Sequence, residues 1–181
     1  SDLSGTNELK AENSAAVTIG APATITGGGT LNAKNPSDCA IYVGGTNLTI
    51  KDCIVNAKGK YGITGQAGSK EKLLISKATV TAEGREGSIC DFATLALSGC
   101  KITEPSGAAF DETMHCVALN GEKVTGKVVI VKDATGINTP ATATTTTQQS
   151  IYTLSGVRLS NDLNNLPKGI YIVNGKKVVK Q

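Results

Sequence analysis

The sequence predicts an all-β protein, built as a parallel β-helix of about five coils and followed by a small antiparallel β element. The first observation is composition: only 3% of the 181 residues are aromatic, tryptophan is absent, and glycine occurs 21 times. The second is a segment that recurs with a period in the low twenties, which is typical of solenoids. The third is the alternation of apolar and polar residues within that segment, which indicates strands. A chain of this kind builds its core from small and β-branched side chains.

Three copies of the repeat align without gaps over their first ten residues. They begin at Asn47 (NLTIKDCIVN), Lys72 (KLLISKATVT) and Thr94 (TLALSGCKIT). We expect four files of residues to point into the coil: Leu48/Leu73/Leu95, Ile50/Ile75/Leu97, Cys53/Ala78/Cys100 and Val55/Val80/Ile102. Looser copies begin at Ala15, Ala23 and Lys127.

The alternation changes phase by one residue between Ile50 and Cys53, as it does at a bend or bulge. A leucine-rich repeat would need the frame LxxLxLxxN, which the copies lack. We therefore expect two or three short parallel strands per coil, with coils stacked at about 4.8 Å. The outward residues predict a polar file, Asn56/Thr81/Thr103, and two cross-coil ion pairs, Asp52/Lys77 and Lys58/Glu83.

The chain divides into a β-helix domain over residues 1–132, a Thr-rich linker over 133–149 and a small β segment over 150–181. The low-complexity run TPATATTTTQQ indicates the linker. Asn174-Gly175, between IYIV and KKVVK, predicts a hairpin with a two-residue turn. Because a sheet of about 30 residues buries little surface, we expect it to pack onto the coil or onto a partner.

Charge and composition exclude two classes of function. The net charge of +3 comes from lysines that are spread along the chain, and few aromatic residues are present to stack on bases, so nucleic-acid binding is not expected. No apolar run approaches the roughly 20 residues of a membrane span. The five cysteines include no CxxC pair, which argues against a zinc site, and we interpret them as buried free thiols.

The last 31 residues, IYTLSGVRL…LPKGIYIVNGKKVVK, resemble the C-terminal sorting domains of the type IX secretion system in Bacteroidetes. The resemblance implies a secreted or cell-envelope protein that lies outside the cell or on the outer-membrane surface. It is carried by Ile151, Tyr152, Leu154, Gly156, Val157, Lys168, Gly169, Tyr171, Val173, Gly175, Lys177 and Val178.

The coil segments ATITGGGTLNAK and NLTIKDCIVNAKGKYGI resemble the right-handed parallel β-helix of pectate-lyase-like proteins, in particular carbohydrate-binding β-helix proteins. The likeness extends over roughly Ala15 to Phe110. It implies a right-handed coil and a polysaccharide ligand.

Catalysis is not expected. A β-helix lyase needs a base and carboxylates that hold calcium against a uronate. Arg85 is the only arginine in the coil region, and we interpret it as part of a solvated turn. His115, the only histidine, has no accompanying nucleophile motif.

One calcium site is a weaker hypothesis. Asp91 and Asp111 end successive coils in SICDF and AAFDE, and Glu112 follows directly. If the coils align, the two aspartates lie about 5 Å apart, which is a spacing at which carboxylates share a cation.

The candidate ligand-binding residues are Tyr42, Tyr61, Lys58 and Lys60, which together would suit an acidic glycan. The leading hypothesis is therefore a secreted or surface-attached, non-catalytic module that binds polysaccharide or another surface ligand. Two alternatives stay open. One is a structural adhesin or spacer stalk that contacts protein through its sheet edges or C-terminal segment. The other is a small, degenerate polysaccharide lyase.

Overall fold

The computed structural model describes residues 3–68, 70–133, 151–153, 159, 166–173 and 176–180. The chain forms two compact units, Ser1–Asn138 and Thr139–Gln181, and the first of them contains the repeat. All regular structure in the described residues is β-structure, which confirms the all-β prediction. Among these residues there is no helix of the length and hydrophobicity needed to cross a membrane.

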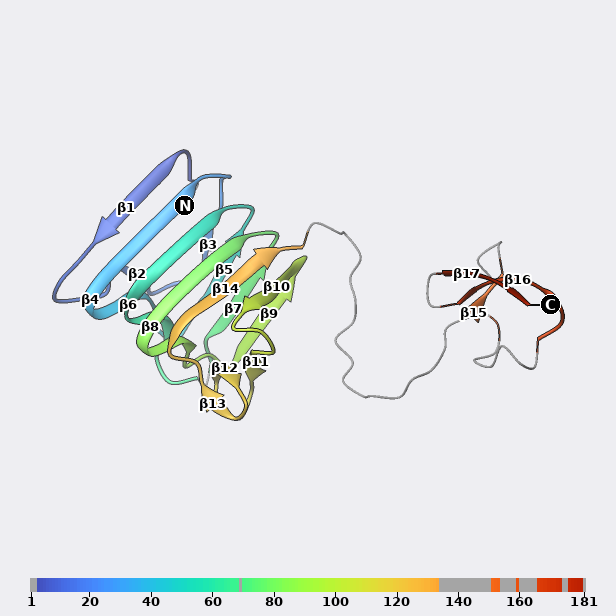
Figure 1. Cartoon of the computed structure of the whole chain (residues 1–181). Helices are drawn as coiled ribbons and strands as arrows, with labels where there is room; N and C mark the ends of the chain where they lie inside the picture. The colour runs from blue at the N-terminus through green and yellow to red at the C-terminus, as the bar shows by residue number, and fades with distance from the viewer. Residues whose placement is uncertain are drawn as a thin grey trace. The chain divides into compact units, whose positions relative to one another are not determined.

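The first unit is a parallel β-solenoid in which each turn adds one strand to each of two sheets (Figure 1). The short sheet consists of β3 (Ala23–Ile25), β5 (Asn47–Lys51), β7 (Lys72–Ser76) and β9 (Thr94–Ser98). The long sheet is built on the bent strands β4 (Thr30–Val43), β6 (Ile54–Gly65) and β8 (Thr79–Cys90). An earlier turn contributes β1 (Thr6–Lys10) and β2 (Val17–Ile19), which both pair with β4 in parallel. The short sheet has four strands, so the solenoid has about four turns, one fewer than predicted.

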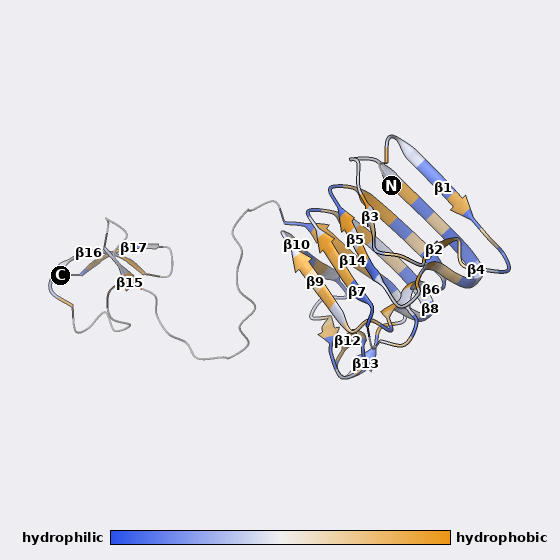
Figure 2. Cartoon of the chain, turned by 180° about the vertical axis from the view of Figure 1, so that it is seen from behind, coloured by the Kyte–Doolittle hydropathy of each residue, from blue (hydrophilic) through white to orange (hydrophobic). Residues whose placement is uncertain are grey.

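The pairing of the short strands confirms two of the predicted core files, Leu48/Leu73/Leu95 and Ile50/Ile75/Leu97. In the two inner turns these side chains are at most 1% exposed. Leu95 and Leu97 are only partly buried, because β9 ends the short sheet. Along the strands, hydrophobic and hydrophilic residues alternate as the files require (Figure 2).

The phase change in each repeat is a residue in the left-handed backbone conformation. Asp52 has φ 51°, Lys77 has φ 48° and Gly99 has φ 60°. A single residue of this kind turns the chain sharply between the short and the long sheet. The predicted bend is thus confirmed, and its cause is one left-handed residue at the same place in each of these three turns.

We expect Lys77→Gly to raise the free energy of unfolding by about 0.5–1 kcal/mol. A lysine in the left-handed region costs about 1–2 kcal/mol, whereas glycine adopts this conformation freely, although it loses more backbone entropy on folding. The Lys77 side chain is exposed, so its removal takes no contact from the core. Urea unfolding followed by far-UV circular dichroism measures the change.

The matched control is Lys72→Gly, which removes another exposed lysine, this time from within β7. There a glycine should destabilise the protein, since no left-handed residue is required and strand propensity is lost. A loss of stability in Lys77→Gly similar to that in Lys72→Gly would contradict the strain that we assign to Lys77.

One of the two predicted cross-coil ion pairs forms. The Nζ of Lys58 lies 2.9 Å from Oε1 of Glu83. The prediction for Asp52 and Lys77 is wrong, because the carboxylate of Asp52 pairs with Lys51, its chain neighbour, at 3.8 Å.

The solenoid ends differently from the prediction. Strand β10 (Cys100–Glu104) does not lie on β8, because β14 (Gly126–Lys132) runs antiparallel between the two. The neighbour of Val80 is therefore Ile130, and Ile102 lies beyond it. The predicted files are corrected accordingly: Val129 separates Thr103 from Thr81, and the segment from Lys127 is a returning strand, not a further coil. Cys100 does keep its place beside Ala78, with its Sγ 3.4 Å from the Ala78 carbonyl oxygen.

Before β14, the chain reverses its direction in a three-stranded antiparallel meander that the sequence did not predict. It contains β11 (Ala109–Asp111), β12 (Cys116–Leu119) and β13 (Glu122–Lys123), paired antiparallel. β12 also pairs with the end of β8 through Cys116 and Cys90. We call β11–β13 the cap, because these strands follow the last turn and pair with the end of β8.

The second unit contains a small antiparallel sheet, as predicted. Its strands are β15 (Ile151–Tyr152), β16 (Gly169–Val173) and β17 (Lys176–Lys180). Val173 pairs with Lys176, so a two-residue connection joins β16 to β17, although Asn174 and Gly175 themselves lie outside the described residues. Except for Asp133, the predicted linker over 133–149 also lies outside them.

Candidate functional site

Lys60 and Tyr61, two of the predicted binding residues, lie on β6 and are both held by Glu86 of β8. The Oη of Tyr61 donates a hydrogen bond to Oε2 of Glu86 at 2.8 Å, and the Nζ of Lys60 lies 3.4 Å from the same oxygen. Lys60 also lies 5.6 Å from the centre of the Tyr61 ring. The hydrogen bond to Glu86, with some burial, raises the pKa of Tyr61 to about 12, and the same bond lowers the pKa of Glu86. These three side chains thus satisfy one another's hydrogen-bonding groups and charges.

Tyr42 is half-buried on β4 and lies opposite Thr18 and Thr64. Tyr61 lies opposite Cys39, three residues earlier along β4, so the two tyrosines belong to different files. The pairing does not place them side by side as one stacking surface for a sugar.

The acidic residues of the calcium hypothesis make local hydrogen bonds. Asp91 accepts a hydrogen bond from Oγ1 of Thr64 at 3.0 Å. Asp111 accepts from the backbone N–H groups of Thr113 at 2.8 Å and Met114 at 2.9 Å, which closes a turn after β11. Glu112 is exposed. In the described part of the chain, no three His, Cys, Asp or Glu side chains gather closely enough to bind a metal ion, and calcium binding stays a prediction.

His115 precedes the second strand of the cap and has φ 55°. Its Nδ1 lies 3.2 Å from the carbonyl oxygen of Phe92, and its ring packs close to Gly68. These contacts join the cap to the last turns, which is a structural role.

A file of charged side chains, four lysines and one glutamate, crosses the outer face of the long sheet. Strand pairing places five residues in register, one on each of five neighbouring strands: Lys10, Lys34, Lys58, Glu83 and Lys127. We call them the lysine file. Neighbouring strands are about 4.8 Å apart, so the file is a regularly spaced row of charge along the solenoid.

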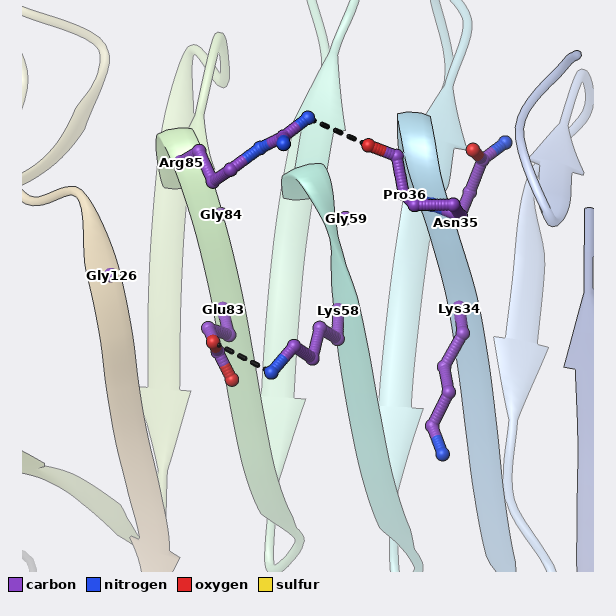
Figure 3. A pocket seen from close by; sticks show the side chains of 9 residues that line it. All are labelled: Lys34, Asn35, Pro36, Lys58, Gly59, Glu83, Gly84, Arg85 and Gly126. Carbon is purple, nitrogen blue, oxygen red and sulfur yellow. Dashed lines mark hydrogen bonds and ion pairs between the residues drawn. The ribbon is translucent and has the colours of Figure 1, made fainter. Parts of the chain in front are cut away.

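Beside the lysine file lies a groove of about 490 Å³. Its walls and floor are formed by Lys34, Asn35, Pro36, Lys58, Gly59, Glu83, Gly84, Arg85 and Gly126. Figure 3 shows Arg85 reaching from β8 past Gly59 of β6 to Pro36 of β4, where its Nη2 donates to the Pro36 carbonyl oxygen at 2.7 Å. The interpretation of Arg85 as a turn residue is corrected, since Arg85 lies within β8, although its side chain is exposed to solvent as expected.

The groove follows from a corner in the long strands, where the pairing register shifts just after Asn35 and Gly59. A Cβ on Gly84, the next residue in that row, would lie 2.0 Å from the carbonyl oxygen of Gly87, so only glycine fits there. In the first of these turns Asn35 takes the same position, fully buried, and its Oδ1 accepts the backbone N–H groups of residues 37 and 38 at 2.9 Å. A Cβ on Gly59 would likewise lie 2.6 Å from the carbonyl oxygen of Asp38, so this row of the corner is packed against backbone atoms.

The groove has an excess of positive charge. Lys58 pairs with Glu83 at 2.9 Å, and Lys127 pairs with Glu104 at 2.7 Å. Within the described residues, no carboxylate lies at ion-pair distance from Lys34 or Arg85. Two cations of the groove are thus available to an anionic ligand.

Of the four predicted binding residues, only Lys58 lines the groove. The sequence analysis did not single out Lys34, and it considered Arg85 only in connection with catalysis. A signal for Lys34 was present, because Asn32-Ala33-Lys34 and Asn56-Ala57-Lys58 repeat the same NAK triplet. The triplets stack in register, and Nδ2 of Asn56 donates to Oδ1 of Asn32 at 2.8 Å beside the two lysines.

A buried carboxylate was also missed. Glu71 is only 2% exposed, and it accepts hydrogen bonds from the backbone N–H of Gly45 and from that of Lys70, both at 3.1 Å. Burial alone would raise the pKa of Glu71, but the surrounding backbone N–H donors outweigh it and lower the pKa. Because these donors come from two different turns, Glu71 ties the loop before β7 to the turn before β5.

Comparison of the chain with protein-family models, with curated proteins and with solved structures found no match.

Proposed function

We propose that the solenoid is a secreted or cell-surface, non-catalytic module that binds an acidic polysaccharide in the groove beside the lysine file. The single observation that carries the proposal is the availability of Lys34 and Arg85 in the groove beside the lysine file, whose other lysines each pair with a glutamate. A polymer with one anionic group per sugar could meet several of these cations along the solenoid axis. The polar file of Asn32, Asn56 and Thr81 beside the lysines supplies amide and hydroxyl groups for sugar hydroxyls.

The likeness of the coils to right-handed carbohydrate-binding β-helix proteins, and that of the tail to Bacteroidetes sorting domains, supports the same reading. A protein exported to the cell surface meets polysaccharides there. The C-terminal unit would then serve export or attachment, and the solenoid would serve recognition.

Binding to polygalacturonate, measured by affinity electrophoresis or a pull-down, tests the proposal. Exposed charge contacts are worth up to about 1 kcal/mol each, so the double variant Lys34→Gln/Arg85→Gln loses up to about 2 kcal/mol and should bind up to about thirtyfold more weakly. Affinity should also fall as salt is raised, because the contacts are exposed to solvent. The matched control is Lys51→Gln/Lys72→Gln, which removes the same amount of charge from exposed positions on the short sheet.

Two results would contradict the proposal. One is the absence of retention by acidic polysaccharides under low salt. The other is an equal loss of affinity in the groove variant and in the short-sheet control, which would indicate only a general effect of net charge.

The reaction product distinguishes the degenerate-lyase alternative from the non-catalytic proposal. A lyase releases an unsaturated uronate that absorbs in the ultraviolet, so a rise of absorbance with polygalacturonate and calcium would overturn the non-catalytic part of the proposal. Loss of that rise in Arg85→Ala would then assign the reaction to the groove.

A structural spacer that contacts protein is favoured by a different observation. At the first turn an apolar groove of about 240 Å³ is lined by Leu3, Leu9, Val17, Ile19, Ile25 and Leu31, among others, and Leu9 is 44% exposed. Exposed apolar surface at a strand edge is typical of protein contacts. Polysaccharide binding that depends on Lys34 and Arg85 would favour the first candidate over this one.

A further inference from the structure

Two cysteines face each other across the junction between the solenoid and the cap. Cys90 ends β8, Cys116 begins β12, and they are direct partners in the antiparallel pairing of these strands. Directly opposed residues of antiparallel strands have Cα atoms about 4.5–5.5 Å apart. This range lies inside the roughly 4.4–6.8 Å that a disulfide spans.

The surroundings keep the two thiols together. Each side chain is 1% exposed, and both belong to one small apolar cluster with Ala118 and Tyr61. The Sγ of Cys90 also lies 3.4 Å from Oγ1 of Thr64. Both cysteines are free thiols in the structure, and they lie in one buried cluster.

The other cysteines lack such a partner. Cys39 lies opposite Tyr61. The Sγ of Cys53 contacts the carbonyl oxygen of Ile25, and that of Cys100 contacts Ala78, in different turns. Among the five cysteines, only Cys90 and Cys116 are direct partners in strand pairing.

A bond between Cys90 and Cys116 would enclose the last turn of the solenoid. The chain leaves β8 at Cys90, forms β9, β10 and β11, and returns at Cys116. This excursion is the last turn, whose strand β9 has a neighbour in the short sheet on one side only. Terminal turns of a solenoid are the first to open, because each turn is stabilised by its neighbours.

We propose that Cys90 and Cys116 form a disulfide that closes the last turn into a covalent ring. Formation is a thiol–disulfide exchange with a small-molecule disulfide such as oxidised glutathione. The thiolate of one cysteine attacks the glutathione disulfide and releases one reduced glutathione. The second cysteine then displaces the other glutathione, so two protein thiols lose two electrons and two protons in all. The inference does not depend on the function proposed for the groove.

Burial affects when the bond can form. It raises the pKa of Cys90 to about 12 and also raises the pKa of Cys116. Little thiolate is therefore present in the folded protein, and exchange there is slow. We therefore expect the two thiols to be oxidised during folding, before the apolar cluster around them is buried.

The test is refolding of the full chain with a mixture of reduced and oxidised glutathione, and separately with a reductant. Free thiols are then alkylated under denaturing conditions, and the peptides are identified by mass spectrometry. We expect a linked peptide pair that contains Cys90 and Cys116, with Cys39, Cys53 and Cys100 alkylated. The matched control Cys53→Ser should retain the linked pair. Alkylation of all five cysteines, or linkage of another pair, would overturn the proposal.

A second measurement tests the ring closure itself. Amide hydrogen exchange over residues 94–104 should be slower in the oxidised protein than in the reduced protein. Cys116→Ser, or Cys90→Ser if the first variant fails to fold, should abolish this difference. Equal exchange in the oxidised and reduced wild-type chains would show that the bond does not stabilise the last turn, and would overturn that part of the inference.

Discussion

Replacing Ile75 with alanine is expected to lower the free energy of unfolding by about 2–5 kcal/mol. Ile75 is 0% exposed, and it lies between Ile50 and Leu97 in the core file of the short sheet. Truncation removes apolar contacts on both sides and leaves a cavity that the stacked strands cannot close, because their spacing is set by hydrogen bonds. Urea unfolding monitored by far-UV circular dichroism measures the loss.

The control for this prediction is Leu97→Ala at the end of the same file. Leu97 is only partly buried and has a stacking neighbour on one side. In a solenoid, stability is a sum over neighbouring turns, so this variant should lose about half as much stability as Ile75→Ala. A loss in Leu97→Ala that equals or exceeds that in Ile75→Ala would contradict the stacked core.

Replacing Glu71 with alanine is expected to cost about 2–4 kcal/mol of stability. A hydrogen bond to a charged group contributes about 1.5–3 kcal/mol, and each buried N–H that loses its acceptor adds a penalty. The N–H groups of Gly45 and Lys70 lose theirs in this variant. Glu71→Gln is the matched variant: it keeps the shape and one acceptor oxygen, so it should cost less. Equal stability of Glu71→Ala and the wild type would show that water satisfies these donors.

The contribution of Glu71 also depends on pH. Its pKa in the folded protein lies below the ordinary value of 4.5, so folding favours the ionised form. The stabilisation is therefore complete above the unfolded-state pKa and is lost as pH falls through the folded-state pKa. The difference in unfolding free energy between wild type and Glu71→Gln should be constant near neutral pH and should shrink below about pH 4.5. A difference that stays unchanged at pH 3.5 would contradict the assignment.

The core files could be predicted because their signal is local and repeats. Each turn places Leu or Ile at the same step after its start, and strand stacking converts equal positions in sequence into neighbours in space. The left-handed bend was visible as a one-residue change of phase. The NAK triplets show that part of the lysine file was present in the same signal.

The end of the solenoid could not be predicted in this way. KVVIVK is a run of four apolar residues between two lysines, and this pattern is the same in either direction along a strand. The cap reverses the chain before β14, so the strand enters between β8 and β10 antiparallel. The cap gives no periodic signal in the sequence, because its strands occur only once.

The sequence by itself determined that this protein is a β-solenoid with a small antiparallel sheet at its C-terminal end, since the period and the alternation state which residues stack. Only the tertiary structure decided which polar residues meet. Arg85 reaches the Pro36 carbonyl oxygen two turns away, and N–H donors from separate turns converge on the buried Glu71. Such contacts depend on the reach of individual side chains across the stack, and a linear pattern does not contain that information.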